Sequence, residues 1–414
     1  MKICILTDRI PPESGGGAER VAWEEALALA KRGHTVSLIT TTERPLKEVE
    51  EKTIEGVRIF YIHSSYPERL RAWRSLYNPS TVGRVKRILQ ELRPDVVHSH
   101  QIHYHLSYHT LRLAKKAGAK VFLTAHDVMS FHYGKLVEFI DPKNLECKKE
   151  WNYRVAPVQQ MRRFKRWYNP FRNGIIRRYI KNLDGFFAVS DALREALVQN
   201  GMPNATVLHN GIDAAEWSAS VEAVQTFQEK FKLEGRHVIF FGGRLNRLKG
   251  GTVMLECLRE VVKKVPSALL LVAGTRDAYL ELLIKQAHQW GIGQNIACTG
   301  WLEGSDLRAA YHAAEVVVVP SICFDSFPTM NLEAMACAKP MVATCFGGSR
   351  EAVEDGITGY IVNPFDTHTM SEKIIELLQD SDKNKRFGQA GHERVIKEFS
   401  LSKQMTNYER IFKS

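Results

Sequence analysis

Long apolar runs are missing from this sequence. No stretch approaches the ~20 consecutive apolar residues that cross a bilayer as a helix. The first ten residues, MKICILTDRI, carry one lysine and an apolar run that stops at Asp8 and Arg9. Such a run is too short for the apolar part of a secretory signal. We therefore expect a cytoplasmic protein.

Cysteine is scarce and scattered. The seven cysteines include no C-x-x-C pair, and an odd number at irregular spacing disfavours both a disulfide framework and a zinc site. We expect reduced thiols that pack as small apolar groups. They are Cys4, Cys147, Cys257, Cys298, Cys323, Cys337 and Cys345.

Two motifs of strong functional meaning are also absent. G-x-G-x-x-G does not occur, which disfavours a dinucleotide site and a coenzyme-dependent dehydrogenase. No D-x-D stands at the end of an expected strand, since Asp380-Ser381-Asp382 follows an expected helix and is interpreted as solvated. We therefore expect no cofactor and no required metal.

What is present is an ordinary globular composition in a chain too long for one core. The chain has 414 residues, of which 44% are apolar and 25% charged, as in soluble domains. Domains of roughly 100–200 residues are the rule, so two are expected. Neither tandem repeats nor low-complexity segments occur.

Short apolar strands alternate with helix-length segments along most of the chain. Such a rhythm predicts parallel sheets with helices on both faces, and the near-continuous apolar strands fit sheets buried on both sides. The rhythm restarts after the turn-rich stretch His209–Ser220. The expected strands are Lys2–Thr7, Thr35–Thr41, Asp95–His98, Lys120–Thr124 and Gly185–Val189, then His237–Phe241, Ala268–Ala273, Asn295–Thr299, Glu315–Val319, Pro340–Thr344 and Gly359–Val362.

The fold class expected is therefore α/β, with two Rossmann-like, doubly wound domains facing a central cleft. Residues 1–208 form the first domain, 209–395 the second, and 396–414 a C-terminal helix that packs back on the first. Helices are expected at Ala18–Arg32, Thr367–Leu378 and Lys383–Phe412. In doubly wound sheets ligands bind outside the carboxyl ends of the strands.

Positive charge is concentrated in one segment. The chain carries a net charge of +11, and residues 148–181 hold eleven Lys/Arg against one acidic residue, a surplus of ten. Aromatic residues are interleaved with these charges, which suits an anionic membrane or a lipid-linked acceptor. A solvated basic helix is the plain alternative. Nucleic-acid binding is disfavoured because no nucleic-acid module accompanies the charge.

Glycines precede the first long helix. Gly15, Gly16 and Gly17 stand directly before it, so backbone N–H groups and the positive end of the helix dipole can approach an anion. A flexible turn is the plain alternative, and a mononucleotide diphosphate is the functional one.

A second glycine-rich loop follows the first strand of the second domain. It reads Gly242-Gly243-Arg244-Leu245-Asn246-Arg247-Leu248-Lys249-Gly250-Gly251. Arg244 and Lys249 are cations at a strand end, which suits the neutralisation of a diphosphate. An exposed basic turn is the alternative.

The third cluster, residues 321–336, is the most specific. A strand ends at Pro320, Asp325 lies in the loop, and a helix is expected from Thr329 with Glu333 inside it. Backbone amides at 329–331 lie between the two carboxylates. A carboxylate for ribose or sugar hydroxyls beside amides for phosphate makes a nucleotide-sugar socket.

At this point the sequence resembles the retaining glycosyltransferases of family 4, which have the GT-B fold. The resemblance rests on Asp325, seven residues, then Glu333-Ala334-Met335-Ala336-Cys337-Ala338-Lys339-Pro340, and on Gly347-Gly348-Ser349-Arg350-Glu351. Further matches in order are the Gly15–Glu19 loop, Asp95-Val96-Val97-His98, Thr124-Ala125-His126-Asp127, Ala188-Val189-Ser190, Asn210-Gly211-Ile212-Asp213, Thr299-Gly300 and Pro320-Ser321.

The resemblance implies a role for each matched position. Arg244 and Lys249 would neutralise the leaving diphosphate, and Asp325 and His126 would contact the donor sugar. Glu333 would hold the ribose hydroxyls. The remaining donor-binding positions implied are Gly16, Gly17, Gly243, Gly300, Trp301, Ser326, Phe327, Thr329, Met330 and Asn331.

Three positions depart from the family pattern. Asp325 replaces the more common Glu, Pro328 a common Gly, and Ala338 a usual Gly. These substitutions are small enough to leave the socket intact and put the choice of sugar in doubt.

The function expected is retaining transfer of a sugar from a nucleotide-diphosphate sugar to a glycan or lipid-linked acceptor, in cell-envelope polysaccharide or glycolipid synthesis. The leaving phosphate is expected to take the acceptor's proton. A nucleotide-sugar epimerase of the same architecture and a non-catalytic nucleotide-sugar-binding protein stay open as alternatives. A pyridoxal-phosphate phosphorylase is disfavoured because no lysine here has the context of a Schiff base.

Overall fold

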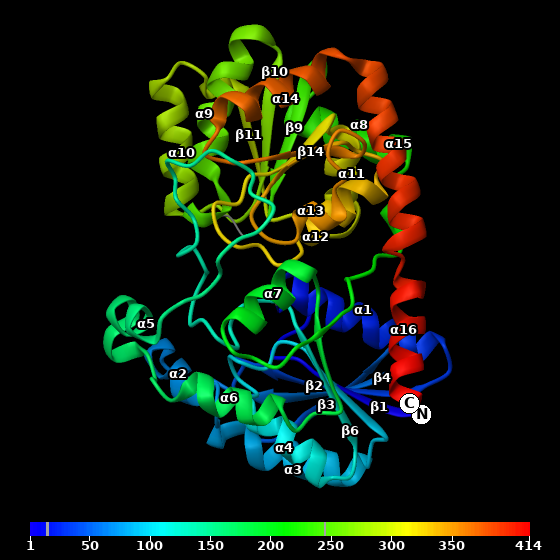
Figure 1. Cartoon of the computed structure of the whole chain (residues 1–414). Coiled ribbons are helices and arrows are strands. Elements are labelled where there is room, and N and C mark those ends of the chain that lie inside the picture. The colour runs from blue at the N-terminus through cyan, green and yellow to red at the C-terminus, as the bar shows by residue number, and fades with distance from the viewer. Residues whose placement is uncertain (14–15, 244–245) are drawn as a thin grey trace. The chain divides into compact units, whose positions relative to one another are not determined.

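The computed structural model describes residues 1–13, 16–243 and 246–414. Within these residues the chain forms two compact units (Figure 1). Unit 1 contains residues 1–139, 152–210 and 401–414, and unit 2 contains residues 140–151 and 211–400. The division differs from the expected domains mainly in residues 140–151, which are counted with unit 2, and by a few residues at the other boundaries, since 209–210 belong to unit 1 and 396–400 to unit 2.

Unit 1 is built on an eight-stranded sheet in the order β3-β4-β2-β1-β5-β6-β7-β8. Neighbouring strands are parallel except β3 and β4, which pair as an antiparallel hairpin. The register places Ile3 beside Val36 and Val96. The strands are β1 (Lys2–Leu6), β2 (Thr35–Thr42), β3 (Glu50–Ile54), β4 (Val57–His63), β5 (Val96–Ser99), β6 (Lys120–Ala125), β7 (Gly185–Ala188) and β8 (Thr206–Val207).

Helices cover this sheet on both faces. In Figure 1, α1 and α16 lie together on one face, and α3 and α4 on the other. The helices are α1 (Gly17–Lys31), α2 (Arg71–Arg74), α3 (Pro79–Leu92), α4 (His109–Lys116), α5 (Pro157–Phe164), α6 (Arg172–Ile180), α7 (Asp191–Gln199) and α16 (Leu401–Lys413), with 3-10 turns at Glu68–Leu70 and Lys165–Trp167.

The core of unit 1 follows from helical and strand periodicity. Val21, Ala22, Ala26 and Leu29 of α1 are buried and lie on one face of the helix, because residues three and four apart share a face. Ala22, Ala26 and Leu29 pack with Met405, Tyr408 and Phe412 of α16 and with alternate side chains of the strands. Each fully buried side chain of this size contributes about 1.5–3 kcal/mol.

Unit 2 is built on a six-stranded sheet in the order β11-β10-β9-β12-β13-β14, parallel throughout. The strand order reverses direction at β9, which is where ligands bind in doubly wound sheets. The strands are β9 (His237–Gly242), β10 (Ala268–Ala273), β11 (Ile296–Gly300), β12 (Val316–Val319), β13 (Met341–Thr344) and β14 (Gly359–Val362).

The helices of unit 2 form two layers around that sheet. A buried cluster joins α9, α10 and α14 to one face, and elsewhere in the unit α8 packs against α11 and α12 against α15. The helices are α8 (Val221–Phe231), α9 (Gly251–Lys264), α10 (Ala278–Gln289), α11 (Gly304–Ala313), α12 (Thr329–Ala336), α13 (Ser349–Ala352), α14 (Thr367–Gln379) and α15 (Ser381–Glu398), with 3-10 turns at Ala214–Trp217, Arg247–Lys249 and Gly293–Asn295.

The expected fold class, two Rossmann-like α/β domains, is confirmed, and each expected strand is present within two residues of its expected ends. One helix prediction was wrong. The segment Lys383–Phe412 is two helices, because the carbonyl of Phe399 accepts the amide of Ile212 at 2.9 Å and Ser400 forms a bridge with Ile212. Those backbone groups are therefore not available to continue a helix.

No helix in the described part of the chain is long and apolar enough to cross a membrane.

Candidate active site

Lys249 and Asp325 form an ion pair at the carboxyl edge of the unit 2 sheet. The Nζ atom of Lys249 lies 2.5 Å from Oδ2 of Asp325, and the hydroxyl of Ser321 donates to the same oxygen at 2.9 Å. The side chains retain 28% and 13% exposure, so the pair is held in place and still open to a ligand. The structure thus joins two of the site residues that the sequence placed 76 positions apart.

Two glycines allow the loops of this edge to approach one another. Gly250 has a φ of +83°, and a Cβ there would lie 1.9 Å from the carbonyl oxygen of Pro320. Gly347 has a φ of +95°, and a Cβ there would lie 2.1 Å from the carbonyl oxygen of Asp325. Both positions therefore require glycine for conformation and for space. The loops after β9, β12 and β13 are fixed against each other as a result.

Helix α12 begins next to the ion pair. Its first residues, Thr329 and Met330, are half-buried, and Gly243 approaches them, since a Cβ on Gly243 would lie 3.8 Å from Sδ of Met330. The N-terminus of a helix attracts anions through its dipole and its amides. The start of α12 and Lys249 therefore offer two sources of positive potential in unit 2.

Two polar side chains of α12 are buried. Glu333 is 6% exposed and accepts a hydrogen bond from the hydroxyl of Tyr311 at 2.6 Å. Asn331 is fully buried, and neither atom of its amide has a hydrogen-bond partner among the described residues. An unsatisfied buried amide costs about 1–3 kcal/mol, so Asn331 is a position where a ligand or water can gain a hydrogen bond.

The remaining donor-binding positions of unit 2 differ in exposure. Trp301 follows β11 and is 37% exposed, and its indole N–H donates to Glu303 at 2.8 Å. Gly300 beside it has a φ of +79°. Ser326 and Phe327 are buried, and the ring of Phe327 packs 5.7 Å from that of Phe399. Trp301 is therefore suited to stack on a base, whereas Phe327 supports the start of α12.

Arg244, the other predicted cation, lies outside the described residues, as does Gly15 of the N-terminal loop. Gly16 is the N-cap of α1 and Gly17 its first residue. The glycines thus stand at the N-terminus of α1, and their contact with a diphosphate stays a prediction.

His126, the predicted catalytic residue of unit 1, directly follows β6. Its ring is half-buried and stacks on the ring of His100, with centroids 5.2 Å apart. Nδ1 of His100 lies 2.9 Å from Nε2 of His126. Burial and the neighbouring histidines His100 and His98 lower the pKa of His126 well below its ordinary value. The ring is therefore neutral at pH 7.

Behind His126 lies a buried carboxylate that the sequence analysis did not single out. Glu25 of α1 is fully buried, with Oε1 2.6 Å from Nδ1 of His98 and Oε2 3.2 Å from Nε2 of His100. Burial alone would raise its pKa, but His98 and His100 lower the pKa of Glu25 to about 2. The available signal was a glutamate at helical spacing between Val21 and Leu29 on an apolar helix face.

Glu25, His98 and His100 also bring three potential metal ligands within 4.8 Å of one another. Two ligands of one tetrahedral zinc ion lie roughly 3.3 Å apart when each bond is ~2.0 Å. The 2.6 Å separation of Glu25 and His98 is that of a direct hydrogen bond. The arrangement therefore fits a hydrogen-bonded network better than a metal site.

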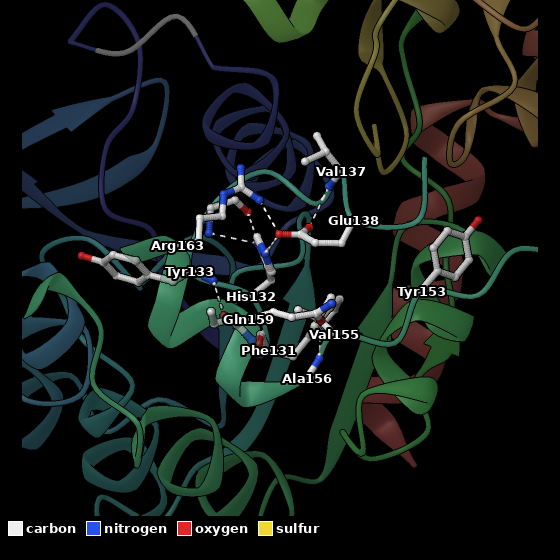
Figure 2. Close-up of polar contacts among 12 residues, drawn as sticks. Phe131, His132, Tyr133, Val137, Glu138, Tyr153, Val155, Ala156, Gln159 and Arg163 are labelled. Carbon is white, nitrogen blue, oxygen red and sulfur yellow. Dashed lines mark hydrogen bonds and ion pairs between the residues drawn. The ribbon is translucent and has the colours of Figure 1, made fainter. Parts of the chain in front are cut away.

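The basic segment 148–181 is divided between the two units. Residues 148–151 belong to unit 2 and the rest to unit 1, where α5 and α6 carry most of the charge. One of its arginines is fully buried, since Arg172 donates to the carbonyl of Met129, and a second, the exposed Arg163, forms an ion pair with Glu138. Figure 2 shows Glu138 between His132, Arg163 and the amide of Val137.

Other side chains of this segment face solvent. Trp167 is 43% exposed and Phe171 71%, although aromatic side chains of this size are usually covered. Besides Arg163, the exposed basic residues of unit 1 in the same segment are Arg154, Arg162, Lys165, Arg166, Arg178 and Lys181. The exposed aromatic and basic side chains form a surface that internal packing does not explain.

Comparison with known proteins shows the family of the chain. Residues 15–216 match the model of Glycosyltransferase Family 4, and residues 224–394 match that of Glycosyl transferases group 1. Glycogen synthase of Mycobacterium tuberculosis is 22% identical over 100% of this chain and 94% of its own length. A GDP-mannose-dependent alpha-(1-6)-phosphatidylinositol monomannoside mannosyltransferase of Mycolicibacterium smegmatis is 27% identical over 54% of this chain and 60% of its own.

Solved structures show the same fold. Sucrose-phosphate synthase of Thermosynechococcus elongatus superposes with a TM-score of 0.76 at 20% identity, covering 100% of this chain and 98% of that one. HepE of Anabaena, solved in complex with UDP, has a TM-score of 0.71 at 16% identity and covers 99% of each chain. Both units and their order are therefore shared with these enzymes, and the chain belongs to the family 4 glycosyltransferases of the GT-B fold.

Proposed function

We propose that this glycosyltransferase moves a sugar, with retention of anomeric configuration, from a nucleotide-diphosphate sugar to a glycan or lipid-linked acceptor. The observation that carries the proposal is the Lys249–Asp325 ion pair beside the start of α12. A cation and a helix N-terminus suit a diphosphate, and a carboxylate suits sugar hydroxyls. Relatives point the same way, since one is named for GDP-mannose and one structure holds UDP.

The proposed chemistry requires stabilisation of negative charge on the leaving diphosphate. As the bond from the anomeric carbon to the phosphate oxygen breaks, Lys249 and the start of α12 stabilise the charge that develops. The acceptor oxygen forms the new bond on the same face, and its proton passes to the leaving phosphate. Because protein cations supply the counter-charge, with Arg244 as the second, the proposal requires no metal.

The proposal assigns Glu333 to the ribose of the donor. Its buried position and its bond to Tyr311 hold the carboxylate in one orientation. In Glu333→Ala that acceptor is lost, so donor binding should weaken about tenfold or more, since hydrogen bonds to charged groups contribute about 1.5–3 kcal/mol.

A panel of nucleoside diphosphates and nucleotide sugars tests this through thermal stabilisation, because a ligand that binds the folded state raises the melting temperature. One nucleotide sugar should stabilise the wild type selectively and stabilise Glu333→Ala much less. Glu372→Ala, at an exposed site on α14, is the control and should respond as the wild type does. A panel without any stabilising ligand would overturn the proposed function.

We further propose that the enzyme works in the cytoplasm at an anionic membrane surface, in cell-envelope polysaccharide or glycolipid synthesis. The support is the exposed surface of unit 1 formed by Trp167, Phe171 and the surrounding basic side chains. Each basic residue near an anionic bilayer contributes about 1 kcal/mol, and amphipathic aromatics suit the headgroup region.

Cosedimentation with phosphatidylglycerol-containing vesicles at low salt tests this membrane proposal. The wild type should sediment with anionic vesicles and be released by salt, because salt screens the attraction. Reversal of charge in Lys165→Glu/Arg166→Glu should reduce binding at least tenfold. The control is Lys385→Glu/Arg386→Glu, which reverses two charges in unit 2. It has the same net charge as the first variant and should bind vesicles as the wild type does. Equal losses of vesicle binding in both variants would mean that the net charge of the protein, and not this surface, is responsible for binding.

A further inference from the structure

A chain of buried polar contacts leads from Glu25 to the half-exposed ring of His126. Its members come from α1, from the end of β5 and from the end of β6. Nε2 of His100 lies 3.2 Å from Oε2 of Glu25, an ion-pair contact, and neither atom has a well-aligned hydrogen-bond partner among the described residues. Nδ1 of His100 in turn lies 2.9 Å from Nε2 of His126. The three groups are therefore connected in series.

The charge of Glu25 sets the direction of each hydrogen bond. Its carboxylate has no proton to donate, because its pKa is about 2. The ring N–H groups of His98 and His100 must therefore point at its two oxygens. A His100 ring that carries this proton alone has a lone pair on Nδ1, which accepts the Nε2–H of His126. The proton of His126 is thus on Nε2, which leaves Nδ1 as a hydrogen-bond acceptor.

The other oxygen of Glu25 is held by a second branch. His98 lies at 2.6 Å through Nδ1, and its Nε2 lies 2.8 Å from the hydroxyl of Thr124. That hydroxyl lies 3.4 Å from the hydroxyl of Tyr408 in α16, which is fully buried. Both carboxylate oxygens are therefore occupied by histidines, and Glu25 cannot rotate to release His100 without losing a contact.

His126 is the half-exposed end of this chain. Among the described residues, no hydrogen-bond partner contacts its Nδ1. The residue follows β6 at the carboxyl edge of a parallel sheet, where ligands bind in this class of fold. A neutral ring whose Nδ1 is a lone-pair acceptor can take a hydrogen bond from a sugar hydroxyl, whereas an Nδ1–H tautomer cannot.

We propose that Glu25, acting through His100, is a positioning residue that fixes His126 in the Nε2–H tautomer and so presents Nδ1 as an acceptor to a hydroxyl of the donor sugar. The tautomer is a property of unit 1 alone. The contact with the sugar rests on the function proposed above.

In Glu25→Gln, the side-chain amide reverses the donor and acceptor roles in the contacts that lead from residue 25 to His126. Its single oxygen can accept from His98, the closer partner, and its NH2 then donates to Nε2 of His100. The proton of His100 moves to Nδ1 and points at His126, whose own proton must move to Nδ1. The variant thus keeps the shape of the side chain and inverts the tautomer of the exposed ring.

Long-range ¹H–¹⁵N NMR spectra of the full-length protein with ¹⁵N-labelled histidine measure this directly, since protonated and bare ring nitrogens have distinct shifts. The signals of His126 are assigned by their loss in His126→Gln. The wild type should show a protonated Nε2 and a bare Nδ1 at pH 7, and Glu25→Gln the opposite. Tyr408→Phe removes a hydroxyl from the second branch only and should keep the wild-type pattern.

Affinity supplies the second readout. Glu25→Gln should bind the nucleotide sugar selected by thermal stabilisation about fivefold more weakly, the cost of one neutral hydrogen bond. It should bind the matching nucleoside diphosphate, which lacks the sugar, as the wild type does. Tyr408→Phe should bind both normally.

Several outcomes would overturn the inference. A protonated Nδ1 on His126 in the wild type overturns the inference without any variant. The inference can therefore be rejected even if Glu25→Gln does not fold. An unchanged tautomer in a folded Glu25→Gln also overturns it, as does an inverted tautomer with unchanged sugar affinity. A panel in which no nucleotide sugar binds would instead reject the proposed function and leave the tautomer result standing.

Discussion

Replacement of Lys249 by alanine should lower turnover about 10²-fold or more while the protein stays folded. A group that stabilises the charge on a leaving group contributes about 3 kcal/mol to the transition state. The variant also leaves Asp325 without the partner that lies 2.5 Å away. Its carboxylate, 13% exposed, would then repel the diphosphate. Release of nucleoside diphosphate from the stabilising donor measures the effect.

Two further variants separate these causes. Arg247→Ala removes an exposed cation from the same 3-10 turn and should keep most of the activity. Lys249→Ala/Asp325→Asn removes the repulsion as well as the cation, so it should be more active than Lys249→Ala if repulsion contributes. Wild-type turnover in Lys249→Ala would reject the role of this lysine. Arg244→Ala is expected to lower turnover by a similar factor.

Gly347→Ala should strongly destabilise the loops around Asp325. At a φ of +95° an alanine costs about 1–2 kcal/mol in backbone strain alone. The added methyl would also lie 2.1 Å from the carbonyl oxygen of Asp325. That contact must open, which breaks the bonds between Asp325 and its neighbours Phe346 and Gly348. The sum is about 3–4 kcal/mol, because each of the two lost hydrogen bonds costs about 1 kcal/mol.

The melting temperature measures this loss, and 1 kcal/mol corresponds to about 2–4 °C for a unit of this size. Gly356→Ala is a matched control, since Gly356 has a φ of +74° with no atom within 4 Å of the added methyl. It should show the strain alone, a loss of about 1–2 kcal/mol. Equal losses in the two variants would mean that the contact with Asp325 has no energetic weight. Gly347→Ala should also bind the donor more weakly, because Asp325 moves.

Local sequence accounts for most of unit 2. The apolar strands and the glycines at their ends predict both the sheet and the edge at which Lys249, Asp325 and α12 are found, because parallel strands end at one edge. The ion pair itself is not a local property. It depends on Gly250 and Gly347 letting the loops after β9, β12 and β13 come into backbone contact.

Local sequence was less informative where polar residues form regular structure. The hairpin of β3 and β4 was missed because the residues of β3, Glu50–Ile54, are largely exposed and lack an apolar alternation. The turn, Glu55-Gly56, has positive φ at both positions, as two-residue hairpin turns require, but glutamate is a weak signal for such a turn.

The charge of residues 148–181 shows the same limit. The net charge of this segment can be counted in the sequence. The sequence does not show which of the charged side chains face solvent. Arg163 forms an ion pair with Glu138. Arg172 is buried, with its Cζ atom 5.9 Å from the centroid of the Tyr133 ring. The partners of these arginines come from the segment 129–138, so only the packing of that segment against α5 and α6 decides which basic side chains remain for a membrane.

The sequence by itself determined the α/β class, the succession of strands, the family and the positions of the donor-site motifs, because periodicity and short motifs are properties of neighbouring residues. The tertiary structure alone decided the pairing of Lys249 with Asp325 and the burial of Glu25 against His98 and His100. In each case the partners are more than 70 residues apart, and the free energy of a buried charge depends on which groups surround it rather than on its place in the chain.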